Sequence, residues 1–498
     1  MKRFTRFVWS IGCAAAVLVG HGPTARADLA AEVHAVLQEK LLHKTTTGIE
    51  VYRLGKTESD VKEVFNLSAQ TPLTPASNLK VATTSAALDQ FGQDFKFRTI
   101  LLMHDGDVIM VGDGDPTFGD AEYLKKAGWK TTTVFVNWAE QLKKLNVAQV
   151  KDVIVDDSVF DEDFSNSHWP AGQYAARFEA EVGGINLNAN CIDFTVTPGA
   201  PGQRVGFSTD PRTSYVSVRN NCVTGNLNRV RLNRDVDSNQ ITLAGETPGR
   251  RNALVSITIH DPPMYAGTVL AETLAANGIK ITGAVKRDRS IRAAYEKIAK
   301  PAGNWQVIAI HETPLAAVLA RCNKDSVNVY AESLCKRLGH ETAHAAGTWP
   351  NGTAAVGAFL RKAGVAQTEF KLDDGSGLSR ADLISPHALA RVLIYDHYSK
   401  NHDFFFNSLS IAGVDGTLDN RFAERGLRDL RRRVIGKSGF IEGVSTVSGY
   451  LHAKDDQWYA FSIMMNGIPR LSNSQVKVLQ EKIIRALDNN TASASARG

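Results

Sequence analysis

The chain contains the segment Pro75-Ala76-Ser77-Asn78-Leu79-Lys80-Val81-Ala82, which places a serine and a lysine three residues apart at the start of an apolar stretch. Residues i and i+3 lie on one face of a helix, so Ser77 and Lys80 become neighbours if this stretch is helical. The start of a helix also favours negative charge on the serine oxygen, because the free N–H groups and the helix dipole point there. The segment therefore predicts a helix over about residues 77–91 that carries a nucleophilic serine and a lysine base.

The S-x-x-K pattern alone is weak evidence, because Ser59 and Ser474 each begin one as well. Ser59 lies in a polar connection between expected strands, and Ser474 lies on the expected terminal helix. Ser77 opens an apolar helix, and two further strings follow it along the chain, Ser326-Val327-Asn328 and Lys437-Ser438-Gly439. Together the three strings match the S-x-x-K, S-x-N and K-[ST]-G set of penicillin-recognising serine enzymes.

Ser326 and Asn328 are expected to serve proton transfers at Ser77. The Ser326 hydroxyl can relay a proton, and the Asn328 amide can bond both Lys80 and a substrate amide. A lysine base must lose its proton near neutral pH, so its pKa must lie far below its ordinary value. We expect burial and the nearby cation of Lys437 to lower the pKa of Lys80.

The third string is expected to hold the substrate at the edge of a strand. Lys437 and Ser438 can bind a terminal carboxylate, and Gly439 lets a substrate backbone approach closely. The backbone N–H groups of Ser77 and Phe440 are expected to form an oxyanion hole.

A different catalytic pattern, His340-Glu341-Thr342-Ala343-His344, matches the H-E-x-x-H string of zinc peptidases. The third ligand position of the extended version falls on Pro350, which cannot bind zinc, and Gly339 predicts a helix end just before the string. A zinc peptidase built on these residues therefore stays a second hypothesis. A third is a non-catalytic cell-wall scaffold that keeps the fold.

The order of predicted elements indicates an α+β multi-domain protein. A penicillin-binding, β-lactamase-like transpeptidase domain, with an antiparallel sheet covered by helices, is expected over residues 28–98 plus 301–488. Short strand-like runs with Gly, Asp and Asn turns predict inserted β-rich domains over residues 99–300. Within the first domain we expect a helix at 30–42, strands at 48–54 and 63–67, a helix from about 327 to 338, a hairpin of 445–453 with 458–466, a helix at 473–487, and a disordered tail at 489–498.

The N-terminus has the pattern of a secretory signal peptide over residues 1–27. Basic residues open it, an apolar stretch follows over residues 7–20, and Ala25-Arg26-Ala27 offers small residues for cleavage. The apolar stretch is shorter than a membrane span needs, so an uncleaved anchor is the less favoured alternative. Export predicts a periplasmic location.

Charge and composition exclude some partners. The net charge of the whole chain is +5, and residues 1–27 hold four basic residues and no acids, so the mature chain is close to neutral. Such a balance does not indicate binding to nucleic acid or to a membrane surface. No later segment is long and apolar enough to predict a membrane span.

Four cysteines follow the predicted leader. Cys191 and Cys222 are a candidate disulfide in a strand-rich region of an exported chain. Cys322 and Cys335 are too far apart to pair along one unbroken helix, so we expect two buried thiols unless the chain turns between them.

Over nearly all of the mature chain, the sequence resembles the low-molecular-mass, class C penicillin-binding proteins of type 4. These are D-alanyl-D-alanine carboxypeptidases/endopeptidases of the S13 serine peptidase family. The resemblance rests on the order of the three strings, on the large gap after Lys80, and on the segments Gly112-Asp113-Gly114-Asp115-Pro116, Asp156-Asp157-Ser158-Val159-Phe160, Asp374-Gly375-Ser376-Gly377-Leu378-Ser379-Arg380 and Gly413-Val414-Asp415-Gly416-Thr417-Leu418.

The resemblance implies that Ser77 is acylated by the penultimate D-alanine of a peptidoglycan stem peptide. The leaving group is then a terminal D-alanine or the cross-linked residue of a neighbouring stem. It also implies inhibition by β-lactams and no metal or organic cofactor. Two positions depart from the family: Ser438 stands where threonine is more frequent, and Phe440 stands where a hydroxyl residue is frequent. We expect the second departure to shift activity toward cross-link cleavage.

Overall fold

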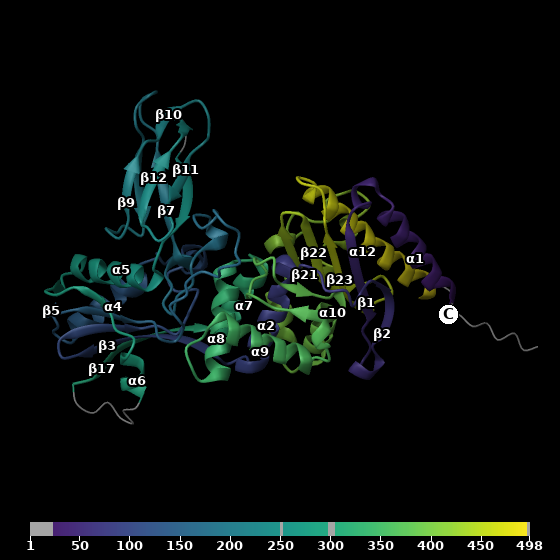
Figure 1. Cartoon of the computed structure of the whole chain (residues 1–498), viewed down its shortest axis with the longest axis horizontal. Coiled ribbons are helices and arrows are strands. Elements are labelled where there is room, and N and C mark those ends of the chain that lie inside the picture. Colours follow the sequence, from purple (N-terminus) through teal and green to yellow (C-terminus); the bar gives the residue numbers. More distant parts are fainter. Residues whose placement is uncertain (1–22, 250–251, 297–303, 496–498) are drawn as a thin grey trace, which may run out of the picture.

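A six-stranded antiparallel sheet forms the centre of what we call the main domain (Figure 1). The computed structural model describes residues 23–249, 252–296 and 304–495. The strand order is β2-β1-β23-β22-β21-β20, which brings the N-terminal hairpin beside the C-terminal strands. The bounds are β1 (Thr46–Arg53), β2 (Lys62–Leu67), β20 (Ser410–Ile411), β21 (Val434–Ile441), β22 (Val444–His452) and β23 (Trp458–Asn466).

Helices cover both faces of this sheet. Ile49 and Val51 of β1 belong to a hydrophobic core under α1 (Pro23–Leu37) and α12 (Asn473–Ser495), as period-two alternation requires. The opposite face packs on α2 (Leu79–Phe91), whose residues 79–88 are buried and, apart from Lys80, are apolar or small. Around α2 lie α7 (Leu315–Lys324), α8 (Asn328–Ala343), α9 (Trp349–Lys362), α10 (Pro386–Tyr398) and α11 (His402–Ser408), with the short pair β18 (Phe370–Lys371) and β19 (Leu383–Ile384).

The inserted region contains a five-stranded mixed sheet in the order β16-β6-β4-β3-β17. Helices α4 (Thr133–Lys144) and α5 (Pro262–Ala276) contribute to its core, so the region is not built from strands alone. Its other elements are β3 (Lys96–His104), β4 (Asp107–Val111), α3 (Ala121–Leu124), β5 (Gln149–Val150), β6 (Val153–Asp156), β15 (Lys280–Ile281), β16 (Val285–Arg287), α6 (Ile291–Glu296) and β17 (Gln306–Pro314).

A second lobe projects from the inserted region (Figure 1). It is made of short strands between β6 and α5, and their polar turns explain why the sequence indicated β-rich domains here. The strands are β7 (Cys191–Thr197), β8 (Gly206–Asp210), β9 (Ser217–Asn220), β10 (Val223–Gly225), β11 (Arg231–Arg234), β12 (Gln240–Ala244), β13 (Glu246–Pro248) and β14 (Ala253–Thr258).

The strands that enter and leave the inserted region differ from the expected limits of 99 and 300. β3 begins at Lys96, and β17 pairs antiparallel with it from Gln306↔Met103 to Pro314↔Lys96. Both crossing strands therefore belong to the inserted sheet, and the chain returns to the main domain at α7.

Two helices continue beyond their expected ends. Helix α8 passes through Gly339 to Ala343, because this glycine serves helix packing: a Cβ there would lie 1.9 Å from Asn351 Oδ1 of α9. Helix α12 runs to Ser495, so the helix end predicted at residue 487 is wrong. Asn490 anchors this end by donating to Glu32 Oε1 of α1.

The candidate disulfide between Cys191 and Cys222 is also wrong, because both thiols are free and buried. Each packs into a different hydrophobic cluster, where a thiol acts as a small apolar group. Cys322 and Cys335 are buried free thiols, as expected. Most of the predicted signal peptide, residues 1–22, lies outside the described residues. Within the described part of the chain, no helix combines the length and apolar character of a membrane span.

Candidate active site

Ser77 lies on a short 3-10 turn, Ala76–Asn78, that leads directly into α2. The helix thus begins slightly later than predicted, but Ser77 stays one turn before Lys80. Ala76 has a φ of 47°, and Gly377 packs so closely on it that a Cβ there would lie 2.0 Å from Ala76 O. The glycine-rich loop 374–377 therefore holds the turn that presents the serine.

Three oxygen atoms surround the Lys80 amine. Lys80 Nζ lies 3.0 Å from Ser77 Oγ, 2.7 Å from Asn328 Oδ1 and 3.0 Å from Ser376 O. The amide and backbone oxygens can only accept, whereas the serine hydroxyl can also donate. A neutral amine, with two N–H bonds and one lone pair, satisfies this set, and its lone pair then faces the Ser77 proton.

Electrostatics favour this neutral form. Burial lowers the pKa of Lys80 from its ordinary value, while the more distant Glu332 and Asp374 oppose the shift. Lys80 is completely buried, and every hydrogen bond of its amine goes to an uncharged oxygen. The expected role of burial is confirmed.

Ser326 lies between α7 and α8 with a φ of 59°, and this conformation directs its hydroxyl to Lys437. Lys437 Nζ lies 2.9 Å from Ser326 Oγ and 2.6 Å from Ser438 O. Burial, and then the charge of Lys80, lower the pKa of Lys437 well below its usual value. Two buried cations disfavour each other's charge reciprocally, so the expected influence of Lys437 on Lys80 is part of the same repulsion.

One edge of β21 is open beside Ser77. Val434 O accepts from Ala412 N, so the backbone groups of every second residue from Val434, including Ser438 and Phe440, point to this edge. β20 covers only Ile435 and Gly436. The N–H of Phe440 therefore faces the open side, as an oxyanion hole formed with Ser77 requires.

Gly439 has a packing role that differs from its predicted role of letting a substrate backbone approach closely. A Cβ at this position would lie 2.8 Å from both Asn78 N and Pro75 O and 2.3 Å from Thr446 Oγ1. The glycine therefore lets β21 pack against the turn that carries Ser77. The side chain of Phe440, on the other face of the strand, is half exposed.

Sequence reasoning missed several residues that complete the site. Thr417 lies 2.9 Å from Ser438 Oγ through its own hydroxyl, which pairs two hydroxyl groups at the open edge. Ser376 supplies a carbonyl to Lys80. Both lie in segments that carried the family resemblance, but nothing in the local pattern assigned them a contact.

A buried carboxylate fixes the Ser376 carbonyl. Glu332 Oε1 accepts from Ser376 N at 2.8 Å, and Oε2 accepts from Gly375 N and from Trp349 Nε1, each at 2.8 Å. Asp374 also accepts from Ser376 N and from Gly377 N. Burial and the nearby Asp374 raise the pKa of Glu332 to about 8.

The inserted region reaches the site at Asn328. Asn328 Nδ2 donates to Phe178 O at 2.7 Å, where a substrate amide was expected to bind. The Phe178 side chain is 46% exposed beside this contact. No sequence pattern could have indicated this contact, because it joins two regions that only the fold brings together.

The H-E-x-x-H residues are not arranged around a common point. His340 Nδ1 contacts Ala345 O, Glu341 pairs with Arg337, and His344 ends α8 in a left-handed conformation. Among residues 23–249, 252–296 and 304–495, no group of three or more His, Cys, Asp or Glu side chains could hold a metal ion.

The fold and the site together define a class of enzyme. An antiparallel sheet between two helical layers, with a serine beside a buried lysine, is the arrangement of the penicillin-binding serine hydrolases. The chain belongs to the D-Ala-D-Ala carboxypeptidase 3 (S13) family, whose model matches residues 29–490. It is therefore a serine-type carboxypeptidase.

Relatives and solved structures agree with this assignment. The D-alanyl-D-alanine carboxypeptidase of Actinomadura sp. (strain R39) is 29% identical over 468 residues, which cover 88% of this chain and 81% of the relative. The carboxypeptidase DacB of Haemophilus influenzae is 26% identical over 447 residues, 86% of this chain and 87% of the relative. The crystal structure of penicillin binding protein 4 from H. influenzae matches with a TM-score of 0.74 at 23% identity, over 92% of this chain and 99% of that one, which shows a shared fold.

Proposed function

We propose that the protein is a serine DD-peptidase of peptidoglycan. It cleaves the D-Ala-D-Ala end of stem peptides and D-Ala–diamino acid cross-links through an acyl-enzyme on Ser77, and β-lactams inhibit it. The observation that carries the proposal is the contact of 3.0 Å between Lys80 Nζ and Ser77 Oγ, made by an amine whose other partners only accept hydrogen bonds.

Acylation starts when neutral Lys80 takes the proton of Ser77. Ser77 Oγ then bonds to the carbonyl carbon of the penultimate D-alanine, and the oxyanion accepts hydrogen bonds from the N–H groups of Ser77 and Phe440. The C–N bond breaks as the leaving amine receives the proton held by Lys80 through the Ser326 hydroxyl, which Lys437 holds at 2.9 Å, and Lys80 becomes neutral again. The products are the ester on Ser77 and a free amine.

Deacylation repeats these roles with water as the nucleophile. Lys80 accepts a proton from the attacking water, the ester C–O bond breaks, and the Ser77 oxygen recovers its proton. The stem peptide leaves with a new carboxylate. β-Lactams would form the same ester, but their leaving group stays attached and hinders the water.

The substrate carboxylate is placed at the open edge of β21. The hydroxyl groups of Ser438 and Thr417 lie 2.9 Å apart there, and the amine of Lys437 lies 2.6 Å from the backbone oxygen of Ser438. Hydrogen bonds from such groups to a charged acceptor are the stronger kind. This orientation runs the peptide along β21 as an added strand.

The substrate lies outside the cytoplasmic membrane, so the proposal includes export. Residues 1–27 act as the signal peptide, and the mature enzyme works in the periplasm.

Labelling with a fluorescent penicillin tests the proposal. Wild type is expected to take up the label with or without a chelator, and Ser77→Ala is expected to lose it. Ser59→Ala is the matched control, because Ser59 begins another S-x-x-K string on an exposed turn. Peptide hydrolysis abolished by the chelator would support the zinc peptidase, and a chain with neither label nor turnover would support the scaffold.

A further inference from the structure

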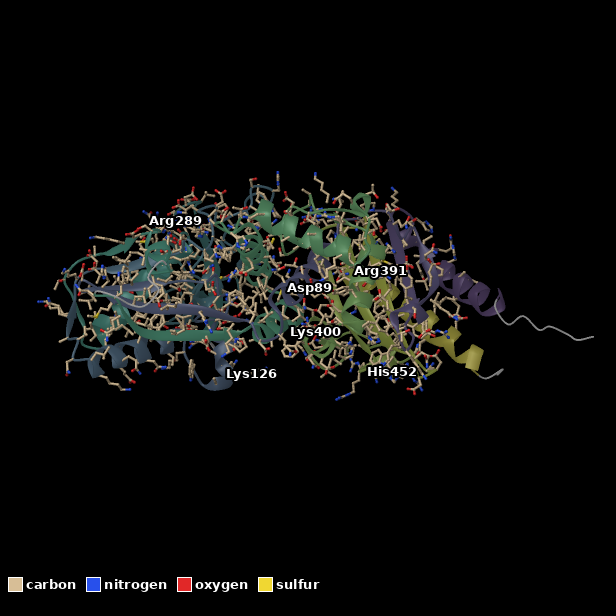
Figure 2. All side chains as sticks on the ribbon, turned by 90° about the horizontal axis from the view of Figure 1, so that it is seen from below. Asp89, Lys126, Arg289, Arg391, Lys400 and His452 are labelled. Atoms are coloured by element: carbon tan, nitrogen blue, oxygen red, sulfur yellow. The ribbon has the colours of Figure 1, made fainter. Side chains whose placement is uncertain are left out.

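A cavity of about 630 Å³ lies next to the proposed site, between the inserted region and the main domain. The segment of α3 and the turn after it forms one wall, with Tyr123, Lys126 and Trp129. The last turn of α7 and the residue after it form the other wall, with Lys324 and Asp325. Figure 2 shows Lys126 near the middle of the long axis of the molecule.

The cavity wall at Lys324 adjoins the segment that precedes Thr417 of the proposed carboxylate subsite. Lys324 pairs with Asp415 at 2.5 Å. Gly416 packs so closely against Lys324 that a Cβ added to this glycine would lie 2.6 Å from Lys324 O. The next residue is Thr417, which bonds Ser438. On the other wall Asp325 directly precedes Ser326, the proposed proton donor to the leaving group.

This position is on the leaving-group side of the scissile bond. Through Gly416, which packs on Lys324, the cavity adjoins Thr417. A chain that continues on this side beyond a carboxylate at Ser438 and Thr417 therefore reaches the cavity. A terminal D-alanine ends at its own carboxylate and therefore does not reach the cavity.

We propose that the cavity binds the second stem peptide of a cross-linked substrate, the strand that leaves with its amine. The inference rests on the proposed function and deepens it. In a cross-link the leaving amine belongs to a residue inside the second stem, so its carboxylate fills the subsite while the rest of that stem extends onward. The volume lies in the range that holds ligands much larger than one amino acid.

The walls offer an ammonium group and an exposed aromatic ring to a peptide that carries carboxylates and apolar methyl groups. Two of the three carboxylates in the lining, Glu312 and Asp325, are paired with cations of the chain. Trp129 is 40% exposed, which leaves an apolar ring free to cover a ligand. Lys126 forms no ion pair with any residue of the described chain, so its ammonium is available to a ligand carboxylate. Arg321 and Asp325 pair with each other, and this fixes the opposite wall.

The test compares a cross-linked stem dimer with a free pentapeptide. For Trp129→Ala and Lys126→Glu we expect kcat/KM on the dimer to fall roughly five- to tenfold, since an aromatic or charged contact is lost. Pentapeptide turnover and penicillin acylation are expected to stay within about twofold, because neither residue contacts the proposed machinery. Phe207→Ala and Lys144→Glu are matched controls on exposed positions outside the cavity.

The outcomes separate this inference from the proposed function. Equal losses on both substrates, or an unchanged rate on the dimer, would overturn it. If wild type is not acylated by penicillin, the proposed function fails. Calorimetric binding of the dimer to Ser77→Ala then still decides the inference: affinity lowered by Trp129→Ala supports it, and unchanged affinity overturns it.

Discussion

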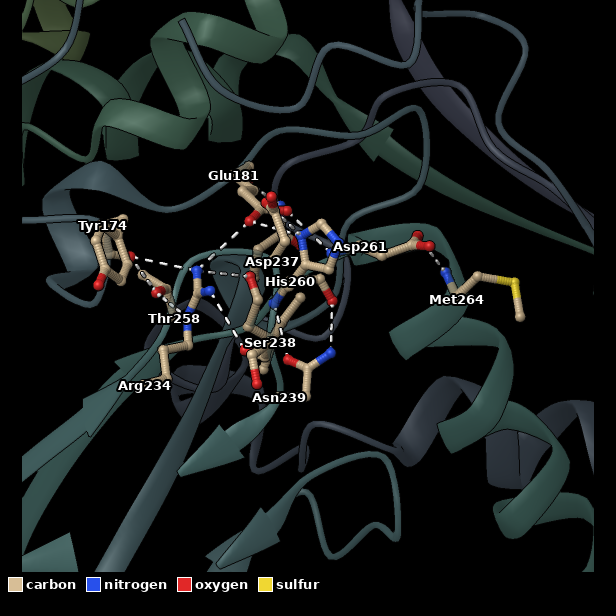
Figure 3. A network of polar contacts seen from close by, with 12 residues as sticks. Tyr174, Glu181, Arg234, Asp237, Ser238, Asn239, Thr258, His260, Asp261 and Met264 are labelled. Carbon is tan, nitrogen blue, oxygen red and sulfur yellow. Dashed lines mark hydrogen bonds and ion pairs between the residues drawn. The ribbon is translucent and has the colours of Figure 1, made fainter. Parts of the chain in front are cut away.

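Two buried polar networks differ in whether their cationic side chains are paired with carboxylates. In the inserted region, Arg234 and Glu181 lie 3.5 Å apart with side chains that are almost fully buried, and His260 Nδ1 lies 3.1 Å from the same carboxylate (Figure 3). In the candidate site, Lys80 and Lys437 are equally buried but hydrogen-bond only to hydroxyl, amide and carbonyl oxygens.

The difference separates an architectural network from a chemical one. Arg234 reaches from β11 to Thr258 of β14 and to Ile259 O, so its paired charge joins the projecting lobe to the segment before α5. A buried ammonium without a carboxylate in contact is unfavourable and loses its proton more readily. The fold tolerates that cost at the position of the proposed base.

The largest expected effect comes from removing the unpaired amine. Lys80→Met keeps the volume and deletes the base, so penicillin acylation should slow by about 10²- to 10⁴-fold. The free energy of unfolding should stay within about 1 kcal/mol or rise, because a costly buried amine has gone. Stopped-flow labelling and urea unfolding measure the two quantities.

Lys62→Met is the control for this change, because Lys62 closes another S-x-x-K string and is exposed on β2. It should alter neither quantity. A Lys80→Met protein that unfolds several kcal/mol more easily would mean that this amine holds the fold, as Arg234 does, and the contrast would be broken.

The second expected effect is a loss of stability without a loss of acylation rate, which is the reverse of the first. Arg234→Met leaves Glu181 buried without its cation, and breaking such a pair typically costs about 3–5 kcal/mol of stability. Thermal and urea unfolding should show this loss, while the acylation rate per folded molecule should remain that of wild type. Arg231→Met, at an exposed position on the same strand, should change little. Normal stability in Arg234→Met would show that the paired network is not architectural.

The pH dependence sharpens the same comparison. Only neutral Lys80 can accept the Ser77 proton, so the acylation rate should rise about tenfold per pH unit below its lowered pKa and level above it. The unfolded state binds the extra proton between that pKa and the ordinary value of 10.5, so stability also rises with pH through this window. A pH-independent acylation rate across the acidic and neutral range would exclude a titrating base.

His260, in the inserted region, makes stability depend on pH with the opposite sign to Lys80. Its hydrogen bond to Glu181 raises its pKa above the ordinary 6.5, so the folded state binds the proton more tightly. This contribution to stability is complete below the unfolded pKa and is lost as pH rises through the folded one. Unfolding of His260→Gln as a function of pH should lack this decline.

Sequence patterns predicted the parts of the molecule that depend on local order. Three such patterns determine local geometry: the spacing of Ser77 and Lys80, the alternation of side chains in the β22–β23 hairpin, and the apolar stripe along α12. The strings around Ser326 and Lys437 could be assigned to the same site as Ser77 and Lys80, because hydroxyl, amide and amine groups in this order are typical of penicillin-recognising serine enzymes.

What the sequence could not provide were contacts made by the backbone of distant segments. The carbonyls of Ser376 and Phe178 carry no residue-type signal, and the glycine at 339 looked like a helix end because close helix packing leaves the same mark as a turn. The cysteine spacing allowed a disulfide, but spacing does not report that two thiols pack into separate clusters.

The smallest expected effect concerns substrate choice at the open edge of β21. Phe440 lies two residues after Ser438, on the same face of the strand, so a hydroxyl there would extend the pair that Ser438 forms with Thr417. Phe440→Thr should therefore strengthen the grip on a free carboxylate and raise kcat/KM on a pentapeptide, relative to a cross-linked dimer, by roughly two- to tenfold. Phe440→Leu removes the ring without adding a hydroxyl and should leave that ratio unchanged. An equal ratio in wild type and Phe440→Thr would discard the idea that the missing hydroxyl turns this enzyme toward cross-links, and the phenyl ring would then be an exposed side chain with no part in selecting the substrate.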